Sequence, residues 1–124
     1  MKFFGIGHDI IEVSRIEQSV MKHQERFYEK LFTDEEIAYC LSKPSPSLHF
    51  AGRFAAKEAL AKALGFGFGS EVRWKEISIL NDENGKPFVE LQGKMGVDFS
   101  NFHIDISISH IKELASAVAI IFTN

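Results

Sequence analysis

The sequence has little of what marks several large classes of protein. Its single cysteine, Cys40, among 124 residues excludes an internal disulfide and has no Cys or His partner at metal-ligand spacing. We therefore interpret Cys40 as a small buried hydrophobic residue. No apolar run approaches the roughly 18 residues of a membrane-spanning helix, and the N-terminus lacks the apolar stretch and cleavage site of a signal peptide. These absences predict a cytoplasmic protein without a membrane segment.

The chain also has no excess of positive charge. Its formal net charge is −3, which argues against a general nucleic-acid binder, although a local basic face remains compatible with it. A length of 124 residues predicts one domain, covering residues 1–124. Such a domain is small for an enzyme that must enclose a large substrate, which favours a site shared between subunits.

The N-terminal half contains one predicted strand and two predicted helices. Apolar residues alternate through 3–13, as in a strand, and Gly5 and Gly7 leave room there for another backbone. Ser14 and Thr33 each begin a capping-box pattern, with a glutamate three residues later. We expect one helix after each of them, the first reaching Arg26.

The longest predicted helix and two hairpins follow. Residues 48–64 are rich in Ala and Leu, and Gly65 stands where a C-terminal cap is expected. The first hairpin turns at Asn84-Gly85, and in the second the strand 104–110 returns as 115–122. Because there is no regular βαβ alternation, the predicted class is α+β.

Two carboxylates stand among apolar residues. Glu58 lies within an apolar stripe of the 48–64 helix, and Asp9 shares a strand face with Ile11 and Val13. A carboxylate facing a core must be paired, protonated or bound to a cation. One interpretation is a shared divalent cation such as Mg²⁺, which takes one or two carboxylates plus phosphate and water. The alternative is ordinary ion pairing, of Glu58 with Lys62 and of Asp9 with another base.

Further residues are candidates for binding an anion. Arg53 and Lys57 are separated by one helical turn, and the repulsion between these like charges would be relieved by a phosphate. The alternative is a solvated face on which both side chains extend into water. His110 ends an isoleucine-lined strand, where it can bind phosphate or serve a structural role. The glycine-rich residues 65–69 lack the spacing of a P-loop, so they are weak candidates.

Three segments in the same order resemble the motifs of one family. The segments 5–16, 53–65 and 106–110 are similar to the opening motif, the central helix and the C-terminal signature of the holo-acyl-carrier-protein synthases, members of the 4'-phosphopantetheinyl transferase superfamily. Motif spacing and total length agree as well, so the resemblance extends over essentially the whole chain. It implies a long central helix on an antiparallel sheet.

The resemblance also implies an activity. These magnesium-dependent enzymes transfer 4'-phosphopantetheine from coenzyme A to a serine of apo acyl carrier protein, in fatty acid biosynthesis, and adenosine 3',5'-bisphosphate leaves. Position by position, the metal ligands fall on Asp9 and Glu58, which with Lys62 are the implied catalytic residues. The coenzyme A contacts fall on Arg53, Lys57, Lys62, Gly65 and His110. Carrier-protein docking falls on the first helix, at Arg15, Met21, Lys22, Arg26 and Phe27.

The resemblance further implies a homotrimer with sites between protomers. We expect Phe50, Leu60 and Leu64 to form a second apolar helix face that serves this assembly. The chain departs from the family at Phe66, where a threonine is usual, and at His8, where the residue is usually apolar.

The docking helix, the general base and the activity each allow more than one interpretation. Glu17 and Glu25 dilute the basic character of the docking helix. The general base is either a metal-bound water or a carboxylate such as Glu36. Alternative functions are a metal-dependent nucleotide phosphohydrolase and a non-catalytic oligomeric binding module.

Overall fold

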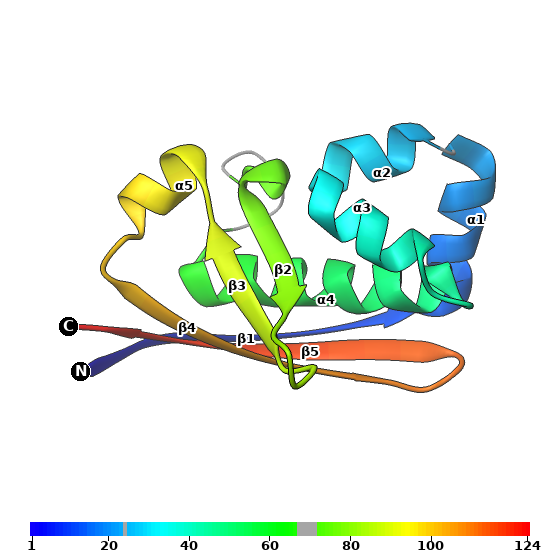
Figure 1. The fold of residues 1–124 in the computed structure, drawn as a ribbon. Coiled ribbons are helices and arrows are strands. Elements are labelled where there is room, and N and C mark those ends of the chain that lie inside the picture. The colour runs from blue at the N-terminus through cyan, green and yellow to red at the C-terminus, as the bar shows by residue number, and fades with distance from the viewer. Residues whose placement is uncertain (24, 67–71) are drawn as a thin grey trace.

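A computed structural model describes residues 1–23, 25–66 and 72–124. Its centre is a long helix, α4 (Pro46–Leu64), which lies across one face of a three-stranded antiparallel sheet (Figure 1). The strand order is β1 (Lys2–Glu12), β5 (Leu114–Thr123), β4 (Phe102–His110). Because Lys2 pairs with Thr123, the two chain ends lie close together at one end of this sheet.

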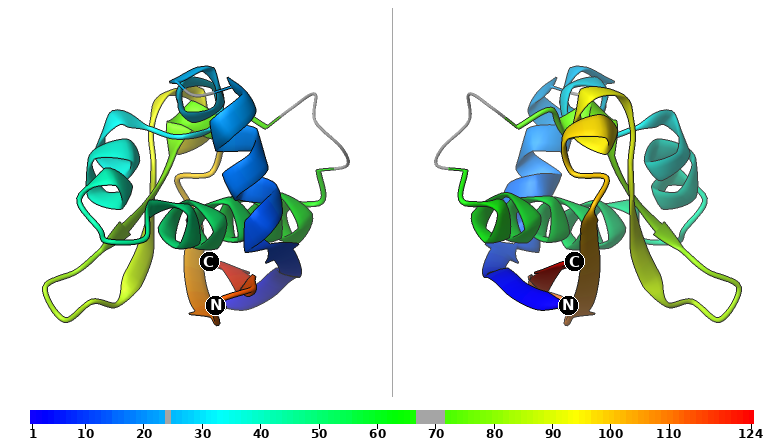
Figure 2. Two further views of the ribbon diagram at one scale, coloured as in Figure 1. Left: turned by 90° about the vertical axis from the view of Figure 1, so that its right-hand side faces the viewer. Right: turned by 90° about the vertical axis from the view of Figure 1, so that its left-hand side faces the viewer.

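The remaining elements cover the parts of α4 that the sheet leaves free. They are α1 (Val13–His23), α2 (Glu25–Leu31), α3 (Asp34–Leu41), the 3₁₀ turn η1 (Trp74–Glu76), the hairpin of β2 (Ile77–Asn81) and β3 (Pro87–Leu91), and α5 (Gly93–Asp98). The end-on views of Figure 2 show α4 between the sheet and the helices α1–α3, with the β2–β3 hairpin running down beside α4 to the level of the sheet. The predicted α+β class is confirmed. Within the described residues, no helix is both long and apolar enough to cross a membrane.

The helix α4 forms where alanine and leucine, strong helix formers, are concentrated. Pro46 occupies its first turn, where no backbone donor is needed, and Gly65 ends it in the left-handed conformation with φ 86°. The prediction that Phe50, Leu60 and Leu64 form a subunit face is wrong. All three are buried in the core of this chain, because elements of the chain itself cover both sides of α4.

The strand β1 packs directly on the backbone of α4. A Cβ atom added to Gly7 would lie 1.9 Å from the carbonyl oxygen of Ala59, and one added to Gly5 would lie 2.1 Å from that of Ala63. The expectation that these glycines admit another backbone is therefore confirmed. Their small size brings the inward-facing residues of β1 close to α4.

The helical N-terminal half differs in detail from the prediction. The Thr33 capping box forms, with Thr33 N donating to Glu36 Oε1 at 2.8 Å and Glu36 N to Thr33 Oγ1 at 3.3 Å. Ser14 is not a cap, because α1 already begins at Val13, directly after β1. The single helix predicted from Ser14 to Arg26 is instead two helices, α1 and α2, and α5 was not predicted.

Candidate active site

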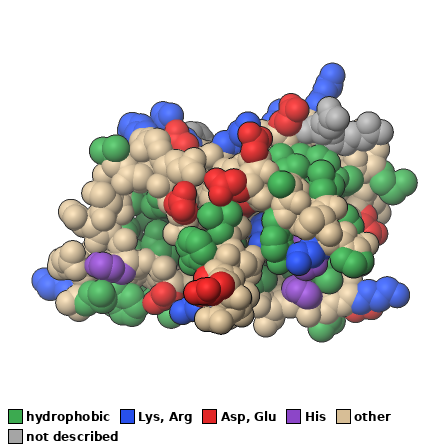
Figure 3. Space-filling model, viewed as in Figure 1, with side chains coloured by type: hydrophobic (Ala, Val, Ile, Leu, Met, Phe, Trp, Pro, Cys, Tyr) green, Lys and Arg blue, Asp and Glu red, His purple; other side chains and the backbone are tan. Residues whose placement is uncertain are grey.

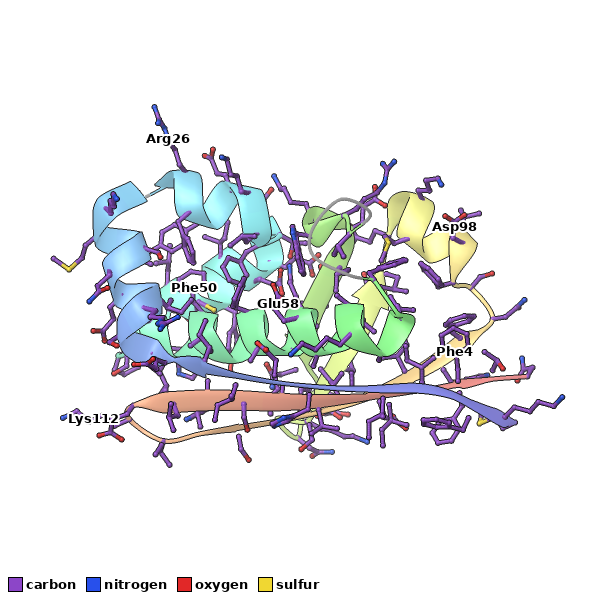
Figure 4. All side chains as sticks on the ribbon, turned by 180° about the vertical axis from the view of Figure 1, so that it is seen from behind. Phe4, Arg26, Phe50, Glu58, Asp98 and Lys112 are labelled. Atoms are coloured by element: carbon purple, nitrogen blue, oxygen red, sulfur yellow. The ribbon has the colours of Figure 1, made fainter. Side chains whose placement is uncertain are left out.

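Asp9 and Glu58 lie at the contact between β1 and α4. Asp9 is on the inward face of β1, where it pairs with the buried Ala117 of β5. Glu58 comes from the middle of α4, above β1 when the molecule is seen from behind (Figure 4). Burial raises the pKa of Glu58, and the negative charge of Asp9 raises it further. The two carboxylates therefore interact at a partly desolvated place.

Lys62 completes this group of charges. Its ammonium donates to Asp9 Oδ1 at 3.1 Å and to the backbone oxygen of His8 at 3.0 Å. The ion pair thus joins Lys62 to Asp9 rather than to Glu58, whose pKa the charge of Lys62 lowers only from a distance. About half of the Lys62 side chain is exposed, so its ammonium can also meet a ligand from solvent.

The carboxylates of Asp9 and Glu58 fit a magnesium ion whose remaining ligands come from a substrate and from water. No group of three or more His, Cys, Asp or Glu side chains suited to a metal occurs in the described part of the chain. Magnesium commonly takes one or two carboxylates and completes its shell with phosphate oxygens and water. A pair of interacting carboxylates, one with a raised pKa, is what such an ion would stabilise.

A second cluster lines a pocket of about 220 Å³ near the N-terminal half of α4. Figure 3 shows histidine and basic side chains gathered on this face, to the right of the β2–β3 hairpin. The lining residues come from α3, α4, the hairpin and β4, and none of them is acidic: Tyr39, Leu48, His49, Gly52, Arg53, Asn81, Gly85, Pro87, Ile108 and His110. The electrostatics of the pocket favour an anion.

Arg53 is the most constrained side chain of this pocket. It is only 5% exposed, its guanidinium carbon lies 4.0 Å from the centre of the Tyr39 ring, and it donates to Asn81 Oδ1. Its Nε is buried and finds no hydrogen-bond partner among the described residues. Through its contacts with Tyr39 and Asn81, the guanidinium is held as a fixed positive charge in the wall of the pocket.

The sequence did not single out Tyr39, His49 or Asn81. Each lines the pocket, but they come from three elements whose relative positions no local pattern reveals. One signal was present for His49, which precedes Arg53 by four residues and so shares its helix face.

Lys57 is not placed to contact a substrate, in contrast to the prediction. Its ammonium lies 2.6 Å from Glu36 Oε1 and donates to the backbone oxygens of Leu31 at 2.7 Å and Trp74 at 2.9 Å. The side chains of Lys57 and Glu36 are both fully buried. Glu36 is therefore not a free general base either, because its carboxylate neutralises this buried cation.

The predicted docking residues are distributed over two helices. Arg15, Met21 and Lys22 are exposed on α1, whereas Arg26 projects from α2 at the top of Figure 4. Arg15 also forms an exposed ion pair with Glu12 at 3.4 Å.

The two apolar docking candidates differ in exposure. Phe27 turns inward, with its ring 5.9 Å from that of Phe32. Met21 is 79% exposed, so of these two side chains it is the one available to a partner.

The segment after α4 is described only at its start. Gly65 caps the helix through its N–H to the backbone oxygen of Lys62. Phe66, where the family resemblance implies a threonine, packs edge-on against Phe99 at 5.9 Å and so contributes to the core. The other glycines of the predicted 65–69 loop lie outside the described residues.

Known proteins of one family match this chain over nearly its whole length. A family model described as the 4'-phosphopantetheinyl transferase superfamily matches residues 5–119. The holo-[acyl-carrier-protein] synthase of Protochlamydia amoebophila is 47% identical over 116 residues, which are 94% of this chain and 95% of that protein.

Solved structures lead to the same family. The holo-(acyl-carrier-protein) synthase of Bacillus anthracis, in complex with CoA (3',5'-ADP), covers 100% of both chains at a TM-score of 0.84 and 36% identity. The corresponding synthase of Helicobacter pylori, in complex with coenzyme A, covers 94% of this chain and 99% of that one, at a TM-score of 0.83 and 35% identity. This chain belongs to the 4'-phosphopantetheinyl transferase superfamily and, within it, to the holo-[acyl-carrier-protein] synthases.

Proposed function

We propose that residues 1–124 act as one phosphopantetheinyl transferase domain. It moves 4'-phosphopantetheine from coenzyme A to a serine of apo acyl carrier protein, for fatty acid biosynthesis, and releases adenosine 3',5'-bisphosphate. Family membership implies this reaction. Within the molecule, the observation that carries the proposal is the pair Asp9 and Glu58 at the contact of β1 with α4, which Lys62 borders; burial and then the charge of Asp9 raise the pKa of Glu58 there.

Asp9 and Glu58 would hold the magnesium ion. When bound, this ion supplies positive charge beside the pyrophosphate of coenzyme A as its phosphorus–oxygen bond breaks. Lys62 reaches the same place from α4 and can donate a hydrogen bond to a phosphate oxygen. Asp9 holds this ammonium in position, so the phosphate meets an oriented donor.

The cationic pocket takes the other phosphate of coenzyme A, the monoester on its ribose. Arg53 and His110 line it, and no acidic side chain does so in the described part of the chain. Within one protomer, however, this pocket and the carboxylates do not open to the same side, because residues 53 and 58 stand about 140° apart around a helix axis. One substrate molecule would therefore lie between the pocket of one protomer and the carboxylates of the next.

The outer face of the three-stranded sheet supplies the surface for this assembly, which we propose is a homotrimer. Phe3, Ile6 and Ile10 are 61%, 59% and 57% exposed on this face. In the strand register, Ile6 lies beside Ile120 and Phe3 beside Phe122 of β5. An exposed apolar surface of this kind indicates a protein–protein contact.

The carrier protein would dock on α1 and the start of α2. Arg15, Lys22 and Arg26 are exposed there, together with Met21. Exposed basic side chains of this kind steer an acidic partner and raise its association rate.

A mass measurement tests the reaction. The protein is incubated with coenzyme A, magnesium and apo carrier protein, and the carrier protein is then weighed by mass spectrometry. We expect a gain equal to one phosphopantetheine. No gain, under conditions in which a known synthase works, would contradict the proposal, and hydrolysis of coenzyme A without a gain would indicate a phosphohydrolase.

A matched pair of variants tests the carboxylate. Glu58→Gln keeps the shape of the side chain and removes its charge, so transfer should fall by about a hundredfold. Glu90→Gln makes the same change at an exposed position of β3 and should transfer at the normal rate. Equal activity of the two variants, both folded, would exclude Glu58 from the site.

A further inference from the structure

His49 is a histidine that lines the pocket but that the sequence motifs do not assign to coenzyme A. It lies on α4 one turn before Arg53 and lines the pocket together with Arg53 and His110. Its ring centre is 6.0 Å from that of His110, at an interplanar angle of 70°, and 5.8 Å from that of Tyr39, at 83°. His49 is thus held by aromatic neighbours on two sides.

The groups that face His49 are cationic or neutral. Arg53 on α4, His110 on β4 and Lys43 between α3 and α4 act on it electrostatically, and Tyr39 adds its ring from α3. No acidic side chain lines this pocket within the described part of the chain. Burial lowers the pKa of His49, and the positive charges of Arg53, His110 and Lys43 lower it further.

An entering phosphate reverses this balance. A phosphomonoester carries between one and two negative charges near neutral pH, and a nearby negative charge raises the pKa of an imidazole. The phosphate charge therefore favours the imidazolium form of His49 over the neutral form. The imidazolium can donate a hydrogen bond to phosphate from either ring nitrogen.

We propose that His49 is a third phosphate-binding side chain of this pocket, beside Arg53 and His110, and that it takes up a proton when a phosphomonoester binds. The inference rests on the proposed function, because it assumes that the pocket holds the ribose phosphate of coenzyme A. Affinity for that phosphate then increases as the pH falls through the His49 pKa of the complex, and it levels off below the His49 pKa of the free protein.

Calorimetry measures the proton uptake directly. Binding of adenosine 3',5'-bisphosphate is followed at pH 7 in buffers of different ionisation enthalpy, so that the slope of the binding enthalpy gives the number of protons taken up. We expect uptake of a fraction of one proton by the unaltered chain, and less with adenosine 5'-monophosphate, which lacks the 3'-phosphate.

Two variants assign the proton. His49→Phe keeps an aromatic ring beside Tyr39 and should lose most of the uptake, with affinity about tenfold weaker at pH 6.5 and a smaller difference at pH 8.5. His110→Phe should lose affinity, and the proton uptake that remains in this variant is assigned to His49. If His49→Phe does not fold, His49→Gln and the imidazole NMR titration of the unaltered protein, with and without the bisphosphate, give the same answer.

The outcomes separate the two proposals. In one outcome, the carrier protein is modified normally but bisphosphate binding takes up no proton. This result would overturn the role of His49 and leave the proposed function standing. Uptake that persists in His49→Phe and disappears in His110→Phe would also overturn it. Failure of the unaltered chain to bind the bisphosphate at all would contradict both.

Discussion

At the scale of single residues, Gly7 controls how near Asp9 comes to α4. A Cβ atom at this position would lie 1.9 Å from the carbonyl oxygen of Ala59 and 2.8 Å from the backbone nitrogen of Ala63. These are backbone atoms of a buried helix, which cannot rotate away as a flexible side chain would. The strand itself would have to move, and Asp9 would move with it.

Gly7→Ala is therefore expected to destabilise the protein by about 2–3 kcal/mol, as overpacked core sites do, and to displace Asp9. Gly52→Ala is the control. Its Cβ would meet only the Cγ2 atom of Ile108, at 3.2 Å, and alanine is favoured over glycine in helices. Urea denaturation of both variants measures the effect. A Gly7→Ala variant as stable as Gly52→Ala would show that β1 and α4 can separate without loss.

Glu58 is expected to destabilise the metal-free protein. Burial and the charge of Asp9 raise its pKa, so the folded chain binds a proton more readily than the unfolded chain does. Stability should then fall as the pH rises from the ordinary carboxyl pKa through the raised value, because the unfolded state binds fewer protons in this window.

Glu58→Gln should consequently stabilise the metal-free chain at neutral pH, by less than about 1 kcal/mol because the site is only partly buried. The gain should disappear at acidic pH, where Glu58 is protonated in both states. Thermal unfolding in the presence of a chelator, between pH 4 and 8, measures this. A variant that is less stable than the unaltered chain at pH 8 would show that the Glu58 charge is favourably paired.

At the scale of elements, one buried polar network joins α3, α4, η1 and β2. Lys57 of α4 contacts Glu36 of α3, and Glu36 Oε2 accepts from the backbone N–H of Ile79 in β2 at 3.0 Å. Ser78 donates to Thr33 Oγ1 at 3.0 Å. Burial lowers the pKa of Lys57, while the charge of Glu36 opposes this shift. The network fixes the hairpin and α3 against α4, and so positions the walls of the pocket.

Breaking this ion pair from one side should be severe. Lys57→Met leaves Glu36 buried without its cation and is expected to cost about 3–5 kcal/mol. The double variant Lys57→Met with Glu36→Gln removes both charges and should recover part of that loss. Chemical denaturation of the two single variants and the double variant forms the cycle. Additive losses would show that the two side chains do not stabilise each other.

At the scale of the whole molecule, the outer face of the sheet is unusual for a protein that acts alone. Phe3, Ile6 and Ile10 expose more than half of their surface there, on the side of the sheet away from α4. Apolar residues at these positions add nothing to the core of one chain, but they would stabilise an interface between copies. In the proposed trimer, this interface also brings together the two halves of each site.

Ile10→Asp should therefore dissociate the proposed trimer and lower transfer at least tenfold, because pocket and carboxylates would no longer meet. Val97→Asp is the matched control, since Val97 is 76% exposed on α5, away from this face. Light scattering coupled to size exclusion gives the mass, expected to be about three times the 14.0 kDa of one chain for the unaltered protein. A monomeric unaltered protein with full activity would contradict the shared site.

Prediction from the sequence succeeded where a few neighbouring residues decide the outcome. Glu58 stood out because an apolar helical stripe surrounded it, and in the structure burial and the charge of Asp9 both raise its pKa. Prediction failed for the pair Arg53 and Lys57, to which their helical spacing assigned the same role. Arg53 lines the pocket, whereas Lys57 is fully buried against Glu36. Helical spacing gives the direction of a side chain but not what lies opposite it.

The sequence by itself determined the local structure of this protein: the capping box at Thr33, the end of α4 at Gly65 and the close approach of β1 at Gly7. These depend on hydrogen bonds and steric contacts that a residue's own type largely dictates. Only the tertiary structure decided which charges meet. Lys62 pairs with Asp9 across 53 positions, and the pocket joins α3, α4 and β4. Electrostatic interactions act through space, so they follow the folded path of the chain.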